Sequence, residues 1–153
     1  MKNTDDVGLL LVRLTLGLVM VVHGSGKLFA VGPVAMPLGQ FEGFLASMGV
    51  PLAGLVAVVV AVVEFLGGVL LVAGLFTRYA ALGVAGVMFG ATVLVHLPNG
   101  FANSNGGVEF TLVLTVVALS LVAMGPGAYS IAELVFDGEY HPSVPFANQS
   151  ASS

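Results

Sequence analysis

Four long runs of apolar residues follow one another along the chain, and short segments rich in Gly and Pro separate them. A helix needs about 20 mostly apolar residues to cross the hydrocarbon core of a bilayer, and each run comes close to that length. None of the runs alternates polar and apolar residues, as the strands of a membrane β-barrel do. The pattern therefore predicts an all-α integral membrane four-helix bundle, with spans at about 8–28, 52–76, 80–97 and 108–124.

The breaks between the runs predict how the helices are connected. Pro51 stands at the start of the second run, where a proline costs no helix hydrogen bond. Only residues 77–79 separate the second run from the third, which predicts a tight antiparallel hairpin. We expect a four-span membrane domain at 1–127 and a polar C-terminal tail at 128–153. In this tail, the segment SIAELVF is expected to form a short interfacial helix and the last ten residues to be disordered.

The composition excludes several classes of protein. Of the 153 residues, 58% are hydrophobic and only 8% are charged, whereas soluble domains carry about 25% charged residues. A soluble enzyme and a disordered chain are therefore excluded, and the lipid bilayer is the expected surrounding. The net charge is −4 with four Lys or Arg, so the chain cannot hold a nucleic-acid backbone. The sequence has no Cys, which excludes disulfides, thiolate metal sites and Cys-ligated iron–sulfur clusters.

Basic residues in short loops set the orientation of a membrane protein, because they are retained on the cytoplasmic side. Lys2, Arg13 and Arg78 lie toward one side of the predicted bundle, and Lys27 lies toward the other. This bias predicts a multi-pass protein of an inner (plasma) membrane, with both termini and the turn that holds Arg78 in the cytoplasm. The loops at 29–51 and 98–107 are then outside.

Ionisable side chains within the spans are the most informative residues, because each costs roughly 2.5–3.5 kcal/mol near the centre of a bilayer. Such residues persist mainly where they face other helices. Together with one Asn of the outer loop, they are the candidates for a ligand pocket: Arg13, His23, Lys27, Glu64, His96, Asn99 and Glu109. No residue is assigned a catalytic role. The spacing of the His and Glu residues matches no metal-binding motif, so no metal site is predicted.

Small residues indicate where helices pack closely against one another. In the second span they share one helix face with Glu64, at Ala57, Ala61, Gly67 and Gly68. Glu64 is therefore expected to point into the bundle rather than at lipid. In the third span, Gly86-x-x-x-Gly90 matches the GxxxG packing motif and is expected to hold the bundle of one chain together.

Two interpretations of Glu64 remain open from the sequence. It is either a carboxylate that binds or relays a proton, or a packed carboxylic acid that is neutral or paired to Arg13. In both cases a polar partner is expected, with Arg13 or a His as the leading candidate. Arg13 itself either pairs with Glu64 or extends to the inner head groups.

The remaining candidates gather near the outer end of the predicted bundle. His23 and Lys27 are four residues apart and share a face of the first span. The end of the third span brings His96 to the same layer, and the start of the fourth brings Glu109. This predicts one outer-side polar pocket with Glu64 at its floor, about 15 Å deeper in a core about 30 Å thick. A simpler alternative for Lys27 is that it extends to the interface.

Such a pocket combines hydrogen-bond donors with acceptors beneath an apolar rim. A quinone has two carbonyl acceptors on its head group and an isoprenoid tail that can lie between helices, so a quinone suits this chemistry. A haem with one axial His from each of two helices is not favoured, because membrane histidines more often form hydrogen bonds. The residues assign no cofactor beyond this quinone-like ligand.

Several short motifs occur in a fixed order along the chain. They are Arg13-Leu14-x-x-Gly17, HGSGKLF at 23–29, EFLGGVLLVAGLFTR at 64–78, HLPNGF at 96–101, GGVEF at 106–110 and GPGAYSI at 125–131. In this order and spacing, the sequence resembles the DoxX family of small four-helix membrane proteins. It departs from the family at 131–133, where Ile-Ala-Glu stands in place of a frequent Ser-x-Asp.

The resemblance implies a connection to membrane redox chemistry. The family takes its name from a subunit associated with a thiosulfate:quinone oxidoreductase, and other members are linked to membrane oxidoreductase complexes. We therefore expect a redox-associated subunit that has other membrane protein subunits as partners and a pocket for a quinone-like ligand. One alternative is a non-catalytic accessory subunit packed against a larger respiratory or photosynthetic complex. A second is a small transporter or proton pathway that uses Glu64. Catalysis by the chain alone is not expected, because it has no thiol and no cofactor motif.

Overall fold

The computed structural model describes residues 4–136, and within this range the chain is helical and contains no strand. The long helices are α1 (Thr4–Leu28), α3 (Ala53–Ala73), α4 (Thr77–Ala91) and α5 (Glu109–Met124). A π-helical turn at Thr92–His96 and a 3-10 turn at Leu97–Asn99 continue α4, and a further 3-10 turn covers Asn103–Asn105. The predicted all-α membrane fold is confirmed. The expectation for the last ten residues lies outside the described residues.

Within residues 4–136, three helical segments are long and apolar enough to cross a membrane: Thr4–Leu28, Ala53–Ala73 and Thr77–Asn99. α5 is apolar but has only 16 residues, which is about 24 Å of helix against a hydrocarbon core of about 30 Å. The described residues also contain α2 (Leu38–Ser47), in a segment predicted to be a loop, and α6 (Ile131–Val135), within the SIAELVF segment. The predicted count of four helices is therefore wrong, and a membrane crossing by α5 stays a prediction.

The connection between α3 and α4 differs from the predicted one by a few residues. α3 ends at Ala73 because Gly74 adopts a left-handed conformation, with φ at 71°, which a glycine reaches without strain. α4 already begins at Thr77. The tight turn is therefore 74–76 rather than 77–79, and Arg78 lies on the first turn of α4.

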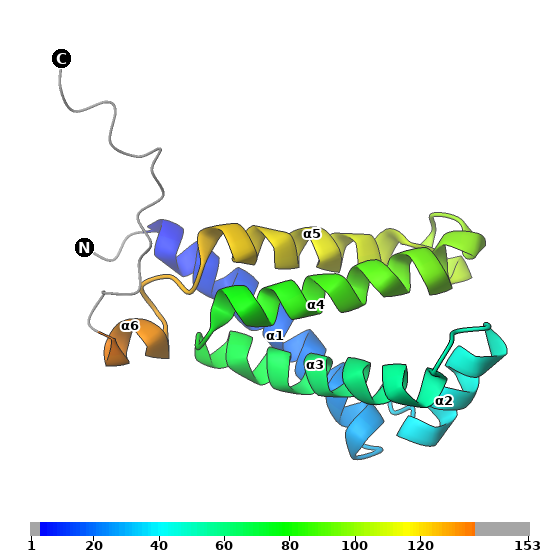
Figure 1. Ribbon diagram of the computed structural model, residues 1–153. Coiled ribbons are helices and arrows are strands. Elements are labelled where there is room, and N and C mark those ends of the chain that lie inside the picture. Colours follow the sequence, from blue (N-terminus) through cyan, green and yellow to red (C-terminus); the bar gives the residue numbers. More distant parts are fainter. Residues whose placement is uncertain (1–3, 137–153) are drawn as a thin grey trace.

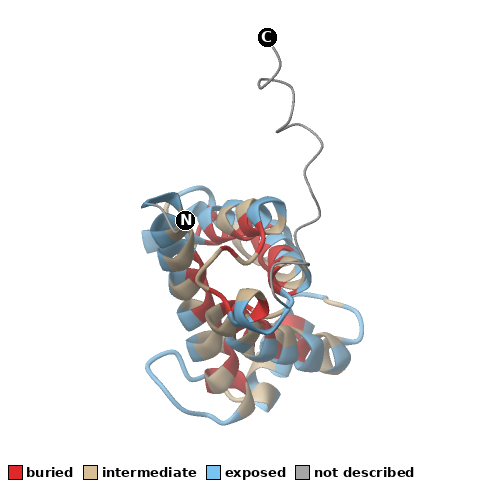
Figure 2. Cartoon of the chain, turned by 90° about the vertical axis from the view of Figure 1, so that its left-hand side faces the viewer, coloured by how far each residue is buried: buried red, intermediate tan, exposed pale blue. Residues whose placement is uncertain are grey.

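The long helices lie side by side, with α1 packed on α3, α3 on α4, and α4 on α5. Figure 1 shows α2 at one end of this bundle, and α6 at the other end, near the start of α1 and the turn between α3 and α4. We call these the α2 end and the α6 end. Seen from the α6 end in Figure 2, the helices turn their buried segments inward and their exposed segments outward.

The outward surface of the bundle is apolar, as expected for a protein solvated by lipid. Each long helix exposes large hydrophobic side chains, for example Leu11 on α1, Leu55 on α3, Phe89 on α4 and Val113 on α5. A water-soluble protein rarely exposes contiguous apolar patches of more than a few hundred Å². The interior holds a smaller apolar core that includes Leu16, Met20, Leu71, Val84 and Leu121.

Glycines let α1 and α3 approach closely. A methyl group at Gly24 of α1 would lie 2.3 Å from the backbone nitrogen of Phe65, and one at Gly68 of α3 would lie 2.7 Å from the carbonyl oxygen of Gly17. Only residues without a side chain fit at such contacts. This close crossing sets which residues of α1 face which residues of α3, and it positions the polar groups described next.

Candidate functional site

A cavity of about 750 Å³ lies between the helices on the α2 side of the bundle. Its walls come from α1, α2, α3, α4 with its π-helical extension, and α5, and most of its lining side chains are apolar. Four of the polar residues selected from the sequence also line it, namely His23, Lys27, Glu64 and His96. The structure thus brings together residues that are up to 73 positions apart in the chain, from His23 to His96.

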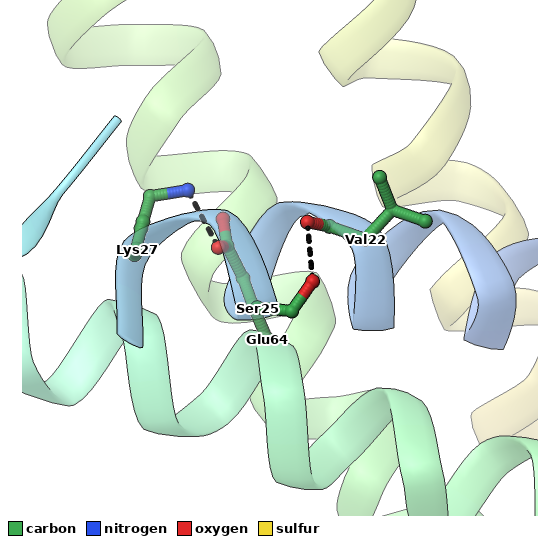
Figure 3. A network of polar contacts seen from close by, with 4 residues as sticks. All are labelled: Val22, Ser25, Lys27 and Glu64. Atoms are coloured by element: carbon green, nitrogen blue, oxygen red, sulfur yellow. Dashed lines mark hydrogen bonds and ion pairs between the residues drawn. The ribbon is translucent and has the colours of Figure 1, made fainter. Parts of the chain in front are cut away.

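Lys27 and Glu64 form an ion pair in the wall of this cavity. Lys27 Nζ on α1 donates to Glu64 Oε2 on α3 at 2.6 Å, and Figure 3 shows the two side chains reaching toward one another between the helices. The residues are only 9% and 4% exposed. Lys27 Nζ also lies 4.9 Å from the ring centroid of Phe41 on α2, within the range of a cation–π contact.

This pairing corrects three predictions about the candidate residues. The partner of Glu64 is Lys27, and neither Arg13 nor a His. Lys27 is buried and does not extend to the interface. Glu64 is not about 15 Å below the outer layer, because its carboxylate is at hydrogen-bond distance from Lys27. The close crossing at Gly24 brings the last turn of α1 beside the middle of α3. The sequence of either helix alone does not reveal where the two helices cross.

The two histidines of the cavity present different hydrogen-bonding groups. His96 Nδ1 lies 2.6 Å from the carbonyl oxygen of Gly106. A carbonyl only accepts, so Nδ1 carries the proton, and in the neutral ring Nε2 is left as an acceptor. His23 is on α1, one turn before Lys27, and its ring has no hydrogen-bond partner among residues 4–136. Both rings therefore keep hydrogen-bonding capacity for a ligand.

His96 lies at an irregular part of its helix. The π-helical turn at Thr92–His96 widens the end of α4, and Leu94, Val95 and His96 from this turn all line the cavity. Such turns are rare and occur frequently at functional sites. The side chain of Thr92 donates to the carbonyl oxygen of Met88 at 2.7 Å, so the hydroxyl group at the start of this turn is bonded back to the preceding turn of α4.

Two of the predicted pocket residues, Asn99 and Glu109, organise the neighbouring loop and do not line the cavity. Asn99 Nδ2 donates to the carbonyl oxygens of Val95 and Gly106, each at 3.3 Å. The Glu109 carboxylate accepts from the backbone nitrogen of Asn103 at 3.0 Å. Both side chains therefore bond to backbone groups of 95–106, next to the cavity wall that contains His96.

Arg13 lies at the α6 end, away from the cavity. Its guanidinium donates to the carbonyl oxygens of Pro126 and Tyr129, which follow α5. It also contacts Gly74, ten residues along α3 from Glu64, a distance of about 15 Å at 1.5 Å per residue. Arg13 thus holds the segment after α5 against the bundle, and the expected pair with Glu64 is wrong.

Several residues that complete the cavity were not among the sequence candidates. α2 contributes Phe41 and Phe44, and the polar groups Asn103 and Thr111 also line the wall. Thr111 shares a buried face of α5 with Leu114, Thr115 and Ala118, so the helical spacing of the small and polar residues in the fourth span could have indicated it. No comparable signal marks α2, because Gly and Pro on either side suggest a loop.

The fold and cavity define an all-α membrane protein with an internal, mostly apolar site that contains a buried ion pair. Residues 8–97 match the model of the DoxX family, and the chain belongs to this family. The match ends before α5, although α5 contributes to the cavity.

Curated relatives match most of the chain. It is 32% identical over 137 residues to the Inner membrane protein YqjF of Escherichia coli (strain K12), covering 88% of this chain and 97% of the relative. It is 30% identical over 144 residues to a Bacillus subtilis (strain 168) protein named "Putative oxidoreductase CatD", covering 94% of this chain and 98% of the relative. No solved structure matches the chain.

Proposed function

We propose that this chain is a redox-associated subunit of an inner (plasma) membrane and that its cavity binds the head group of a quinone-like ligand. The observation that carries the proposal is the cavity of about 750 Å³, in which apolar walls meet Lys27, Glu64, His23 and His96. This volume is in the range of roughly 300–1,000 Å³ found for small-molecule sites. The name of the Bacillus subtilis relative supports the redox part of the proposal.

The polar groups of the cavity suit both redox forms of a quinone head group. Lys27 Nζ gives one of its three hydrogens to Glu64, so the others are available to the carbonyl oxygens of a quinone. The carboxylate of Glu64 and Nε2 of His96 accept hydrogen bonds, as the hydroxyl groups of a quinol require. The apolar walls provide a surrounding for the tail.

The proposed placement in the membrane follows from the positions of the basic residues. Arg13 and Arg78 lie at the α6 end and Lys27 lies toward the α2 end. We place the α6 end and both termini in the cytoplasm, with α5 as a fourth crossing. The membrane domain is then 1–127, followed by the tail at 128–153. The chain has no Cys, so any thiol-based or Cys-ligated redox centre of the assembly belongs to other membrane subunits.

A proton pathway through Glu64 is less well supported. On the α6 side of the cavity, Leu16, Leu71 and Leu121 are each at most 1% exposed and pack the bundle interior. A pathway across the bilayer has to pass these apolar side chains, and the buried hydroxyl groups on this side, such as those of Thr77 and Thr115, are separate from one another.

The absence of Trp from the chain allows a direct binding test. Phe44 lies in the cavity wall, so a Phe44→Trp variant places a fluorophore there that quinones quench. We expect decylubiquinone to quench it saturably in lipid nanodiscs, and a Tyr79→Trp variant at the α6 end to show only weak, non-saturating quenching. The double change Lys27→Met/Glu64→Leu, added to Phe44→Trp, should remove saturation.

Two outcomes would contradict the quinone proposal. One is the absence of saturable quenching in Phe44→Trp, and the other is unchanged affinity after removal of the ion pair. Purification from native membranes with lipid mass spectrometry tests the alternative that the chain is an accessory subunit of a larger complex. A large complex that co-purifies in fixed ratio without quinone would instead identify an accessory subunit.

A further inference from the structure

α3 and α4 are in contact near the turn that joins them and separate toward the α2 end. A methyl group at Gly67 would lie 3.2 Å from Val84, and one at Gly83 would lie 3.4 Å from Val63. Farther along α4, a methyl group at Gly86 or Gly90 would have no atom within 4 Å outside α4 itself. Figure 1 shows the same divergence of the two helices from their turn toward α2. The expected packing contact of the GxxxG motif is therefore absent within the described residues.

The cavity extends into this gap. Val56 and Val60 of α3 and Gly86 and Gly90 of α4 all line it. Gly86 and Gly90 are one turn apart and share a helix face, so α4 presents a strip without side chains at this place. Gly86 is exposed at the outside of the bundle. The cavity thus reaches the outer surface of the bundle between α3 and α4.

The rim of the opening is apolar and lies at membrane depth. Val56 and Val60 of α3, which line the cavity, are half-buried, and Leu94, one turn beyond Gly90 on α4, lines the cavity and is 59% exposed. Gly86 and Gly90 lie about 14 and 20 Å along a membrane-spanning segment, Thr77–Asn99, that is about 33 Å long at 1.5 Å per residue. An apolar rim near the middle of a span opens to hydrocarbon rather than to water.

We infer that the cavity takes up its ligand sideways from the bilayer, through the gap between α3 and α4 over Gly86 and Gly90. The ligand class is a lipid-soluble molecule with a polar ring and an apolar tail. Its ring reaches Lys27 and Glu64, and its tail remains in the glycine-lined gap. This inference deepens the proposed function and rests on it for the identity of the ligand.

The glycines allow the gap to be narrowed without disturbing the fold. Gly86→Leu and Gly90→Leu add a side chain where there is free space, and Leu is a better helix former than Gly. We expect both variants to keep the wild-type Tm. They should slow the binding of decylubiquinone by about tenfold, because the added side chain narrows the gap through which the ring passes and in which the tail lies. Gly8→Leu on α1, which also has no neighbour within 4 Å, is the matched control and should leave the kinetics unchanged.

A second measurement does not depend on quinone binding. In this Cys-free chain, Gly90→Cys should react in liposomes with a membrane-soluble pyrenyl maleimide but not with a charged, water-soluble maleimide. Leu18→Cys, exposed on α1, should react in the same way, and Ser104→Cys in the exposed loop should react with both reagents. Bound decylubiquinone should protect Gly90→Cys and leave Leu18→Cys unprotected.

The outcomes separate this inference from the proposed function. Saturable quinone binding with unchanged kinetics in both Leu variants would overturn the sideways path and leave the quinone site standing. Reaction of Gly90→Cys with the water-soluble reagent would also overturn it, because the gap would then face water. If the wild-type protein binds no quinone while the labelling pattern is as expected, the opening to lipid stands and the proposed ligand is wrong.

Discussion

Removing one member of the Lys27–Glu64 pair should destabilise the protein strongly, whereas removing both should not. The two side chains are joined at 2.6 Å, and both residues are almost fully buried. Loss of one partner leaves the other charge uncompensated, which costs about 3–5 kcal/mol, whereas apolar replacement of both partners is often neutral. For a protein of this size, this cost corresponds to a fall in Tm of about 6–20 °C.

The assay is a double-mutant cycle on Lys27→Met, Glu64→Leu and their combination, read as Tm from size-exclusion chromatography after heating in detergent. We expect each single variant to lose stability and the double variant to return close to the wild type. Glu64→Gln should be milder than Glu64→Leu, because the amide oxygen still accepts a hydrogen bond from Lys27. Glu109→Leu is the control, since this exposed carboxylate bonds only to a backbone nitrogen and should change Tm little.

Additive losses in the double variant would refute the reasoning, because two independent residues show no coupling. A rise in Tm for Glu64→Leu alone would refute it as well, since the remaining ammonium would then carry no penalty.

Three further predictions concern other parts of the molecule. Arg13→Met should lower the Tm and make the segment after α5 more sensitive to protease, because two hydrogen bonds to a charged donor are lost, each worth about 1.5–3 kcal/mol; a wild-type digestion pattern would argue against this role. Gly24→Ala should strongly reduce the yield of folded protein, because the added methyl group meets the backbone of α3 at 2.3 Å, whereas Gly8→Ala should have no effect; equal yields would contradict the close crossing. An impermeant maleimide on intact cells should label Ser47→Cys and not Ser150→Cys, and the reverse pattern would invert the proposed orientation.

The long helices could be predicted from the sequence because each is a nearly uninterrupted apolar run, and lipid imposes this pattern directly. The helix boundaries at 74–77 were harder to predict. Arg78 and Tyr79 suggest a polar break between two helices, whereas α3 ends earlier, at the left-handed Gly74. α2 was missed because it is short and Gly and Pro lie on both sides of it.

The candidate site was predictable in part, since an ionisable residue in an apolar run is conspicuous by itself. His23, Lys27, Glu64 and His96 were selected for this reason, and all four line the cavity. The pairing among them was not predictable, because it depends on where α1 crosses α3. Gly24 and Gly68 indicate that a close approach is allowed, but only the folded chain shows that Lys27 reaches Glu64 and that Arg13 comes beside Gly74.

The arginine contacts at the α6 end have a consequence for the order of assembly during synthesis. Arg13 belongs to the first helix that the ribosome makes, yet its acceptors at Pro126 and Tyr129 follow the last long helix. Arg78 likewise donates to the carbonyl oxygens of Val122 and Ala123 at the end of α5. Until α5 is inserted, water or lipid phosphate must therefore solvate both guanidinium groups, and the earlier helices form an open assembly that α5 closes. A nascent chain that stopped at residue 97, where the match to the family model ends, would hold both arginines without these acceptors.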